Sequence, residues 1–381
     1  MRIIGKGKTA VAIKERFDSS WFDDNDHDSF DPNSSEPTVI SPGVPPHNKL
    51  VASTINPISD LDIIKPPYSI WISGTNGKTT TTSMVELLLK NKGAICGGNI
   101  GTPVVQLDEK AKIWVLEVSS FTIHYTTKAI PNIYLLLPIT PDHISWHGSF
   151  EAYKQTKLKP LKTMGKQSIA ILPETHKHIK TQAKTIYYKN TKELAKKYNI
   201  DTSKINFKEP FLFDAVISLV VSILLDQKPN YKLLNSFKQD NHKIERITDK
   251  KGRVWINDSK ATNIDATIQA IKTFKSKKIY LILGGDDKDV NMTTLFDFLK
   301  DLNIELFCIG KSSQKIHTQL SKRDLKTTQL QTLQNAVKHI DKLYQDKNDI
   351  AILSPACSSF DQFNSYKQRG EKFKQFVFEL S

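Results

Sequence analysis

Residues 77–82 place a glycine, a lysine and four threonines directly after an apolar segment. The segment 68–72 is rich in β-branched and aromatic residues, which is typical of a buried strand. Beyond the threonines, apolar residues recur at helical spacing, so we expect a helix that begins near Lys78. In such a strand–turn–helix unit, Gly77 lets the backbone approach a phosphate, Lys78 supplies a cation and the Thr79 hydroxyl can ligate Mg²⁺. This arrangement predicts a nucleotide site.

The match to the phosphate-binding pattern is incomplete, because the pattern has a glycine five residues before Gly77 and this chain has Ile72 there. Gly-Lys-Thr also arises by chance, and the alternative is an ordinary surface turn. The strand before it and the helix after it favour the nucleotide site. The residues expected to contact the nucleotide in this loop are Gly74, Thr75, Asn76, Gly77, Lys78, Thr79 and Thr80.

Two further apolar segments of this region end in side chains that can bind metal ions. Residues 113–116 lead to Glu117, and residues 133–137 lead to an Asp-His pair that contains His143. Strands that alternate with helices predict a doubly wound parallel sheet, whose ligands bind at the carboxyl ends of its strands. Beside a nucleotide, Glu117 and His143 are expected to bind Mg²⁺. Each of them alone could equally be a hydrogen-bonded carboxylate or a core histidine.

The strand–helix alternation restarts in a third region, from about residue 241. Apolar segments at 253–257, 279–283 and 349–353 are each followed by a polar loop. The pattern predicts a second Rossmann-type sheet with its own binding edge. Cys357 lies in the last of these loops among small residues. The sequence places no histidine beside it, so we interpret it as a packing residue and not as a nucleophile.

The length of 381 residues suggests two or three domains. We predict an α/β protein with three domains, which comprise residues 1–66, 67–240 and 241–381. The first begins with a short strand that runs into a glycine turn at residues 5–7. For that turn, a phosphate contact and a plain tight turn are both open interpretations.

The net charge of +14 suggests a nucleic-acid partner at first sight. The lysines, however, are scattered along the whole chain, and no module of aromatic and basic residues stands out. A field that attracts anionic small molecules explains the charge as well, so we expect no nucleic-acid partner. The three cysteines are far apart, which argues against disulfides or a zinc site and indicates a reducing compartment.

The longest apolar run, residues 211–225, is too short to span a bilayer and contains Asp214. We predict that it forms a buried core helix and that the protein does not insert into a membrane. The N-terminus lacks the apolar core of a signal peptide, so we expect a cytoplasmic protein.

These motifs resemble those of the Mur ligases of peptidoglycan synthesis. The resemblance covers residues 68–381 strongly and the first region weakly. The motifs that carry it are Gly74-Thr75-Asn76-Gly77-Lys78-Thr79-Thr80, Gly98-Asn99-Ile100-Gly101, Glu117 with Ser119-Ser120, Asp142-His143, Lys157, Asn257-Asp258-Ser259-Lys260-Ala261-Thr262-Asn263, Leu283-Gly284-Gly285-Asp286, Lys288 and Ser354-Pro355-Ala356-Cys357. Those of the third region look most like the family members that add D-glutamate.

The resemblance implies three domains: a small Rossmann-like N-terminal domain for a UDP-sugar, a central P-loop ATPase domain with a parallel sheet, and a Rossmann-like C-terminal domain. It implies ATP-dependent ligation of D-glutamate to UDP-N-acetylmuramoyl-L-alanine through an acyl phosphate, with two Mg²⁺ ions and a carbamylated Lys157. A monomer is expected.

The resemblance also assigns roles to individual residues. It implies Lys78, His143 and Lys157 as catalytic residues, and Thr79, Glu117, His143 and Lys157 as metal ligands. Further nucleotide contacts are expected from Asp214, Asn257, Asp258 and Lys260. Substrate contacts are expected from Thr9, Asn99, Ser119, Thr262, Lys288, Ser359 and Phe360.

Three features depart from the family pattern. The first region is short for a UDP-binding domain, Asp214 stands where an asparagine is usual, and the usual His-Arg pair is His242-Lys243. The alternatives are a folylpolyglutamate synthase or another Mur ligase, and, in a different class, a P-loop ATPase that acts on nucleic acid. The absence of an Asp-Asn-Pro-Arg motif disfavours the family member that adds a diamino acid.

Overall fold

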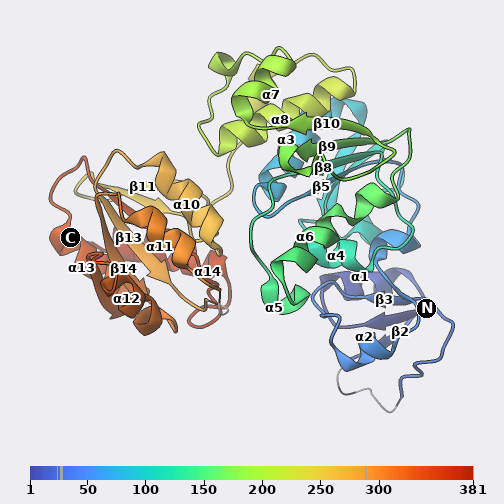
Figure 1. Ribbon diagram of the computed structural model, residues 1–381, viewed down its shortest axis with the longest axis horizontal. Helices are drawn as coiled ribbons and strands as arrows, with labels where there is room; N and C mark the ends of the chain where they lie inside the picture. The colour runs from blue at the N-terminus through green and yellow to red at the C-terminus, as the bar shows by residue number, and fades with distance from the viewer. Residues whose placement is uncertain (24, 26–28, 288–289, 381) are drawn as a thin grey trace. The chain divides into compact units, whose positions relative to one another are not determined.

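The computed structural model describes residues 1–23, 25, 29–287 and 290–380. Three sheets follow one another along the chain, with helices between most of their strands (Figure 1). Contacts between Cα atoms divide the chain into two compact units, Met1–Phe237 with two sheets and Lys238–Ser381 with one. The α/β fold class is confirmed, and the domain boundaries at residues 66 and 240 stay predictions.

The first sheet is small and parallel, with strand order β2-β1-β3-β4. Its elements are β1 (Arg2–Ile4), α1 (Lys8–Arg16), β2 (Ser20–Phe22), β3 (Thr38–Ile40), α2 (Lys49–Ser53) and β4 (Pro57–Ile58). The connector to the second sheet is held by Asp62, whose carboxylate accepts hydrogen bonds from the backbone N–H of Thr127 (2.8 Å), Lys128 (2.8 Å) and Ala129 (2.9 Å). The Tyr125 hydroxyl donates to the Val44 carbonyl oxygen over 2.8 Å.

The second sheet has six parallel strands in the order β10-β9-β8-β5-β7-β6. Its strands are β5 (Tyr68–Ser73), β6 (Ala94–Gly98), β7 (Ile113–Glu117), β8 (Ile133–Leu136), β9 (Ile169–Pro173) and β10 (Lys184–Tyr188). Its helices are α3 (Lys78–Leu89), α4 (Ser120–Tyr125), α5 (Ile144–His147), α6 (Phe150–Leu158), α7 (Thr191–Lys197), α8 (Phe211–Leu224) and α9 (Tyr231–Asn235).

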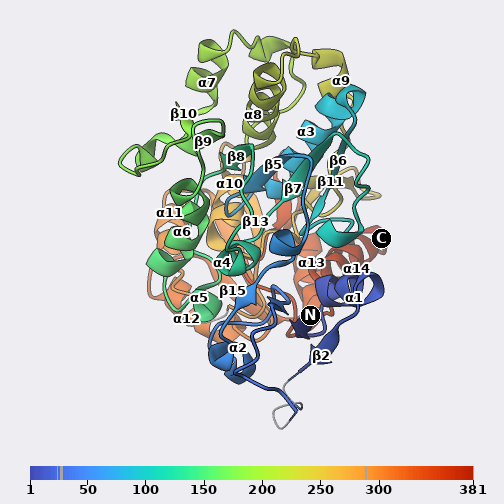
Figure 2. The same ribbon diagram turned by 90° about the vertical axis from the view of Figure 1, so that its right-hand side faces the viewer.

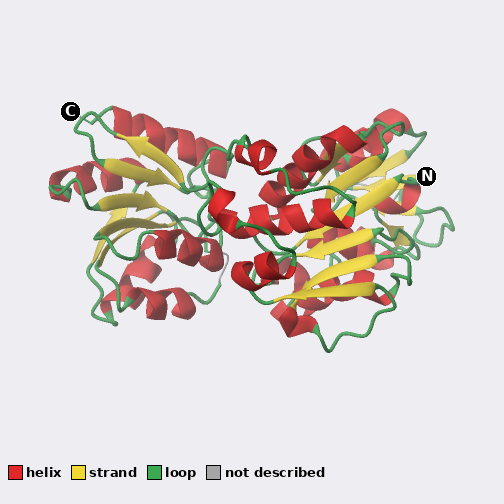
Figure 3. Cartoon of the chain, turned by 90° about the horizontal axis from the view of Figure 1, so that it is seen from above, coloured by secondary structure: helices red, strands yellow, loops and turns green. Residues whose placement is uncertain are grey.

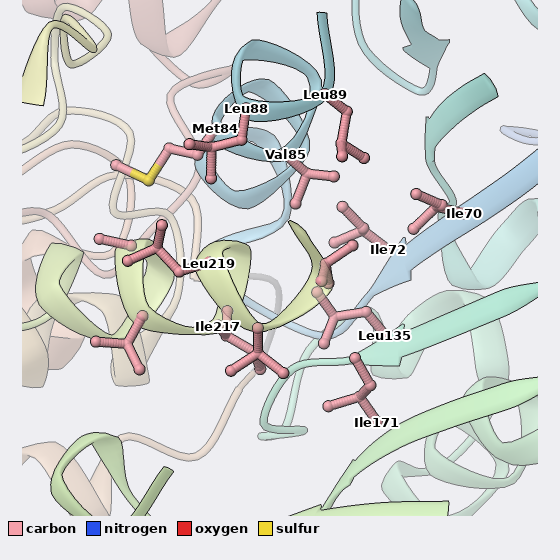
Figure 4. Packing of buried hydrophobic residues seen from close by; sticks show 14 of the residues in the cluster. Ile70, Ile72, Met84, Val85, Leu88, Leu89, Leu135, Ile171, Ile217 and Leu219 are labelled. Carbon is pink, nitrogen blue, oxygen red and sulfur yellow. The ribbon is translucent and has the colours of Figure 1, made fainter. Parts of the chain in front are cut away.

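Both faces of this sheet are covered by apolar side chains, as a parallel sheet between helices requires. Ile70 and Ile72 of β5 pack with the apolar sides of α3 and α8 (Figure 4), and these two helices lie side by side (Figure 2). Trp71, between the two isoleucines, points to the opposite face and joins a core that contains Trp114 and Leu158. The burial of both faces fixes the register of β5 and therefore the position of the loop that follows it.

The third sheet has strand order β11-β12-β16-β13-β14-β15; β11 pairs antiparallel with β12, and the other pairs are parallel. Its strands are β11 (Glu245–Thr248), β12 (Val254–Asn257), β13 (Ile279–Gly284), β14 (Ile304–Ile309), β15 (Thr327–Gln331) and β16 (Ile350–Leu353). Its helices are α10 (Ile264–Thr273), α11 (Thr293–Leu299), α12 (Ser313–Ser321), α13 (Leu333–Leu343) and α14 (Tyr366–Phe378). They cover both faces of the sheet (Figure 3), with one apolar core on each side.

The expected strands and the expected helix start are confirmed. The helix after the glycine turn begins at Lys78, and the apolar run at 211–225 is the buried helix α8. Within the described residues, no helix is both long enough and apolar enough to cross a membrane.

Candidate functional site

The loop between β5 and α3 needs glycine at two positions. Gly74 has φ +141°, and a Cβ there would lie 2.5 Å from the Cβ of Leu137. Gly77 has φ +85°, and its Cβ would lie 2.7 Å from Oδ1 of Asp214. Both the left-handed backbone and the close neighbours exclude a larger residue. Glycine at both positions therefore lets the loop turn tightly against Leu137 and Asp214, and the predicted phosphate contact of Gly77 stays a prediction.

Lys78 is the first residue of α3, and its ammonium folds back over this loop. Its Nζ donates to the carbonyl oxygens of Gly74 (3.1 Å) and Thr75 (2.8 Å). No acidic residue lies in the first turn of α3, so the positive end of the helix dipole and the lysine act in the same direction. Both favour an anion at this loop.

Thr75 contributes mainly to the shape of the loop. Its hydroxyl exchanges hydrogen bonds with the backbone of Thr140 (3.0 Å to O and 2.9 Å from N) and lies 3.0 Å from the Tyr153 hydroxyl. These contacts fasten the loop to the segment after β8 and to α6. Asn76 and Thr79 are half-buried in the same loop, and Thr80 is buried.

Thr79, Glu117 and Asn99 form a cluster of oxygen-bearing side chains next to Lys78. Oε2 of Glu117 accepts a hydrogen bond from the Thr79 hydroxyl over 2.8 Å, and Oε1 accepts one from Nδ2 of Asn99 over 2.7 Å. Glu117 is only 3 % exposed. The structure brings the predicted metal ligands Thr79 and Glu117 together, and it places the predicted substrate residue Asn99 beside them as a partner of Glu117.

Lys157 is a buried lysine on α6 that faces this cluster. It is 1 % exposed, and its Nζ lies 3.3 Å from the Ser73 hydroxyl and 4.9 Å from the centre of the Tyr153 ring. Burial lowers the pKa of Lys157 well below 10.5, and the charge of Lys78 lowers it further, whereas Asp142 and Glu117 raise it. The amine is therefore held near these carboxylates in a surrounding that disfavours its charged form.

His143 lies in the loop after β8, with a left-handed backbone at φ 53°. Its Nε2 is 3.6 Å from Oδ2 of Asp142, and its ring packs edge-on against Phe121. The predicted substrate residue Ser119 caps α4, since its hydroxyl accepts a hydrogen bond from the N–H of Thr122 over 3.0 Å. The half-exposed Thr9 lies in the first turn of α1 in the first sheet.

The side chains of this region fit Mg²⁺ in chemistry. A buried carboxylate with a hydroxyl beside it offers the hard oxygen ligands that this ion prefers. Within the described residues, no group of three or more His, Cys, Asp and Glu side chains could hold a metal ion by themselves. A metal site here therefore depends on the threonine, on modified Lys157 or on the phosphates of a ligand.

Asp214 is buried in α8, below the phosphate loop. Its Oδ1 accepts a hydrogen bond from the Thr81 hydroxyl over 3.1 Å, and it is the atom that a Cβ at Gly77 would meet. The carboxylate thus supports the start of α3 from underneath. Its predicted role as a nucleotide contact stays a prediction.

The predicted nucleotide residues of the third sheet lie at the carboxyl end of β12. Nδ2 of Asn257 lies 2.8 Å from Nδ1 of His242 and donates to Oε2 of Glu245 over 3.0 Å. The Asp258 carboxylate accepts a 2.7 Å hydrogen bond from the Ser354 hydroxyl, and burial raises its pKa to about 7. Lys260 lies 3.4 Å from the Asp240 carboxylate.

The predicted D-glutamate residues follow strands of the same sheet. Thr262 is half-buried after β12, and Ser359 is 2 % exposed in the loop after β16. Phe360, the next residue, is 74 % exposed, so its ring is free to cover a ligand. Lys288 lies outside the described residues. Cys357 is 1 % exposed and burial raises its pKa to about 12, in keeping with the interpretation of Cys357 as a packing residue.

Two residues that hold the candidate site in place, Tyr153 and Arg369, were not identified from the sequence. Tyr153 joins the phosphate loop to Lys157, and its spacing of four residues from Lys157 on one helix face could have suggested it. Arg369, on α14, donates hydrogen bonds to the loops after β12 and β16. No sequence motif predicts that contact.

The chain is similar to known proteins over nearly its whole length. The family model for the Mur ligase middle domain matches residues 72–214, and the model for the Mur ligase, glutamate ligase domain matches residues 242–357. Curated relatives called UDP-N-acetylmuramoylalanine--D-glutamate ligase are 46 % identical in Campylobacter jejuni strain 81-176 and 43 % identical in Helicobacter pylori strain 26695, and each match covers 98 % of both chains.

Solved structures share the fold at low sequence identity. A MurF ligase from Thermotoga maritima in complex with ADP gives a TM-score of 0.61 at 16 % identity, covering 93 % of this chain and 90 % of the other. The UDP-N-acetylmuramate-alanine ligase MurC of the same organism gives 0.58 at 14 % identity, covering 98 % of both. From the full-length curated relatives and both domain models, we conclude that the chain belongs to the Mur ligase family.

Proposed function

We propose that this protein is an ATP-dependent ligase that adds D-glutamate to UDP-N-acetylmuramoyl-L-alanine, a step in the synthesis of peptidoglycan precursors. The observation that carries the proposal is the match, over 98 % of the chain, to relatives that have this activity in their name. The placement of Lys78, Glu117 and Lys157 around one phosphate loop supports it.

The reaction has two chemical steps. The terminal carboxylate of the UDP-linked substrate attacks the γ-phosphate of ATP, which gives an acyl phosphate and ADP. The amine of D-glutamate then attacks the acyl carbon, inorganic phosphate leaves, and the amine loses a proton as the amide forms. Both steps gather negative charge on phosphate oxygens, so they need fixed cations and N–H donors.

The phosphate loop supplies these groups. Gly77 would let the backbone approach the phosphates. The ammonium group of Lys78 donates hydrogen bonds to two carbonyl oxygens of the loop, and on ATP binding it would donate to phosphate oxygens instead. Tyr153 and Thr75 hold the loop in place, so little reorganisation is needed when ATP binds.

Mg²⁺ would be held by Thr79 and Glu117, with His143 and carbamylated Lys157 near a second ion. When bound, these ions would neutralise phosphate charge. Carbamylation of Lys157 requires an uncharged amine to attack CO₂, with loss of one proton. The lowered pKa of this buried lysine favours the step, and the anionic product offers oxygen ligands where an ammonium would repel a cation.

The third sheet is proposed to recognise D-glutamate. This amino acid brings two carboxylates and must present a free amine, so its site needs a cation and hydrogen-bond donors at fixed separation. Lys288 and Thr262 are assigned to the α-carboxylate, and Ser359 with Phe360 to the side chain. Asn257, Asp258 and Lys260 are assigned to the nucleotide. A cytoplasmic monomer remains our expectation.

Amino-acid-dependent release of phosphate from ATP tests the proposal. The purified protein receives ATP, Mg²⁺, UDP-N-acetylmuramoyl-L-alanine and each of a panel of D- and L-amino acids. We expect phosphate release with D-glutamate and an amide product of matching mass. Dependence on a folate substrate and L-glutamate would indicate a folylpolyglutamate synthase instead. Stimulation of ATP hydrolysis by nucleic acid alone would place the protein among the other P-loop ATPases.

A further inference from the structure

Arg369 is a buried cation in the first turn of α14. Its residue is 1 % exposed, which makes it one of the largest fully buried side chains described. Burial lowers the pKa of Arg369 to about 10, so the guanidinium remains charged at neutral pH. Long cationic side chains on helices normally extend into water, so a fully buried one calls for an explanation.

The guanidinium donates four hydrogen bonds, and all of them reach two loops. Nε donates to the Ser259 hydroxyl (3.0 Å), and Nη2 donates to the Ser259 carbonyl oxygen (2.9 Å). Nη1 donates to the carbonyl oxygen of Ser358 and Nη2 to that of Cys357, each over 3.2 Å. The first loop follows β12 and the second follows β16, two neighbouring strands of the third sheet.

None of these acceptors carries a charge. Within the described part of the chain, Arg369 forms no ion pair with a carboxylate, although the charges of Asp361 and Asp258 raise its pKa. The charge also lies close to the N-terminal end of a thirteen-residue helix, where the helix dipole disfavours cations. Burial and the dipole both oppose the charge, so stability alone does not account for it.

The position of the guanidinium suggests what its charge is for. It lies at the carboxyl ends of β12 and β16, and a Cβ at Gly285, just after β13, would come within 3.3 Å of Nη1. Three adjacent strands therefore end around one buried cation. Thr262 and Ser359, the residues assigned above to D-glutamate, lie in the two loops that the guanidinium joins.

We propose that Arg369 is a positioning residue for the amino-acid substrate: it locks the loops after β12 and β16 into one unit and adds a positive charge that has no directly paired carboxylate among the described residues, beneath a site for a dicarboxylate. This inference rests on the proposed function, because it takes the amino acid bound at this edge to be D-glutamate. The fork shape of the guanidinium matters, since only a planar group with several N–H donors reaches both loops at once.

Arg253 provides a matched control in the same unit. Its side chain is 4 % exposed, and it also donates to backbone carbonyl oxygens, those of Asp341 and Tyr344. It differs in two respects: it is paired with the carboxylates of Asp249 and Asp341, and it precedes β12, at the end of the strand opposite to Arg369. Replacing Arg253 disturbs a buried arginine without touching the substrate edge.

The test compares Arg369→Lys with Arg253→Lys in the full chain. Lysine keeps the charge and loses the fork, so Arg369→Lys is expected to raise KM for D-glutamate about tenfold or more. The KM for ATP should change less than about threefold, and kcat at saturating D-glutamate should remain near that of the unchanged protein. Arg253→Lys should lower the melting temperature and leave KM for D-glutamate unchanged. Arg369→Ala should regain D-glutamate affinity on addition of guanidinium below denaturing concentration, and not with sodium chloride at equal ionic strength.

Each result decides the matter. An Arg369→Lys protein with normal KM for D-glutamate, or with equal losses for ATP and D-glutamate, overturns the inference, as does an equal effect of Arg253→Lys. If Arg369→Lys does not fold, Ser259→Ala is tested in its place. This substitution removes the hydrogen bond from Nε of Arg369 to the Ser259 hydroxyl and leaves the guanidinium buried. An unchanged KM for D-glutamate in Ser259→Ala would then count against the proposal. If the unchanged protein does not use D-glutamate at all, the proposed function itself fails, and this outcome is visible before any variant is made.

Discussion

The hydroxyl of Thr79 donates a 2.8 Å hydrogen bond to Oε2 of Glu117, although one residue lies in the first turn of α3 and the other at the end of β7. The contact joins the phosphate loop to the neighbouring strand. It gathers two oxygen ligands at the edge where the phosphates of a nucleotide are expected, so a metal ion can bind there without rearrangement of the strands.

Glu117→Gln should abolish most ligase activity without unfolding the protein. Glutamine keeps the shape of the side chain and can still accept a hydrogen bond from Thr79, but it removes the negative charge that a divalent cation needs. We expect kcat/KM to fall by about a hundredfold or more, with a higher Mg²⁺ concentration needed for half-maximal activity. Full activity of this variant, or of the unchanged protein in excess chelator, would remove the metal argument.

Lys78→Ala should stop ligation while the melting temperature changes little. The lysine is half-buried, and its hydrogen-bond partners are backbone carbonyl oxygens at the edge of the loop, so its contribution to stability is small. Steady-state kinetics and circular dichroism on the same preparation check both parts. A folded variant with near-normal turnover would show that the phosphate loop has been assigned wrongly.

Lys157 should carry a carbamate in the active protein. We expect a carbamate resonance in the ¹³C spectrum of protein incubated with labelled bicarbonate, and its loss in Lys157→Met. Lys154→Met is the control, because Lys154 lies on the same helix and forms a surface ion pair with Glu151. A crystal of active, metal-bound protein with a bare ammonium at Lys157 would refute the prediction.

Asp258 should make the stability of the third sheet depend on pH. Its native pKa of about 7 exceeds the value of 3.8 for a free aspartate, so between these values the native state binds more protons than the unfolded state. Stability therefore falls as pH rises through this range, by an amount on the order of 4 kcal/mol, and levels off above about pH 7. Asp258→Asn should lose this slope. Urea unfolding at a series of pH values measures it, and identical slopes in both proteins would contradict the assignment.

Lys288→Ala should weaken the use of D-glutamate selectively. Loss of one charge-assisted hydrogen bond costs about 1.5–3 kcal/mol, so kcat/KM for D-glutamate should fall roughly ten- to a hundredfold. The KM for ATP and for the UDP-linked substrate should change far less. Lys300→Ala, which removes a lysine paired with Asp297 at the end of α11, is the control. A Lys288→Ala protein that loses ATP binding instead would place the residue in a different site.

The elements predicted from the sequence include some that an apolar run and a glycine turn mark together. The strand before the phosphate loop and the start of α3 are examples, because burial on both faces of β5 leaves a continuous apolar segment. The edge strand β11 was not identified, since only Ile247 of its four residues is buried and no apolar run results.

The site was predictable where a residue type carries the chemistry and unpredictable where geometry does. Glu117 and Lys78 follow from their position after strands. Arg369 does not, because its partners are mostly backbone carbonyl oxygens, which every residue has. The contact between Asn99 and Glu117 likewise depends on the turn after β6, where Gly98 has φ +96°.

The Asp62 carboxylate accepts hydrogen bonds from the backbone N–H groups of residues 127–129, and these bonds bear on the length of substrate that the protein would accept. With the Tyr125–Val44 hydrogen bond, they tie the first sheet to the second, so the two cannot rotate apart within their unit unless several hydrogen bonds break. These hydrogen bonds therefore fix the distance from the glycine turn after β1 to the phosphate loop. We expect a substrate that binds at both places to be selected by its length, because a shortened or lengthened one would present its carboxylate at the wrong place.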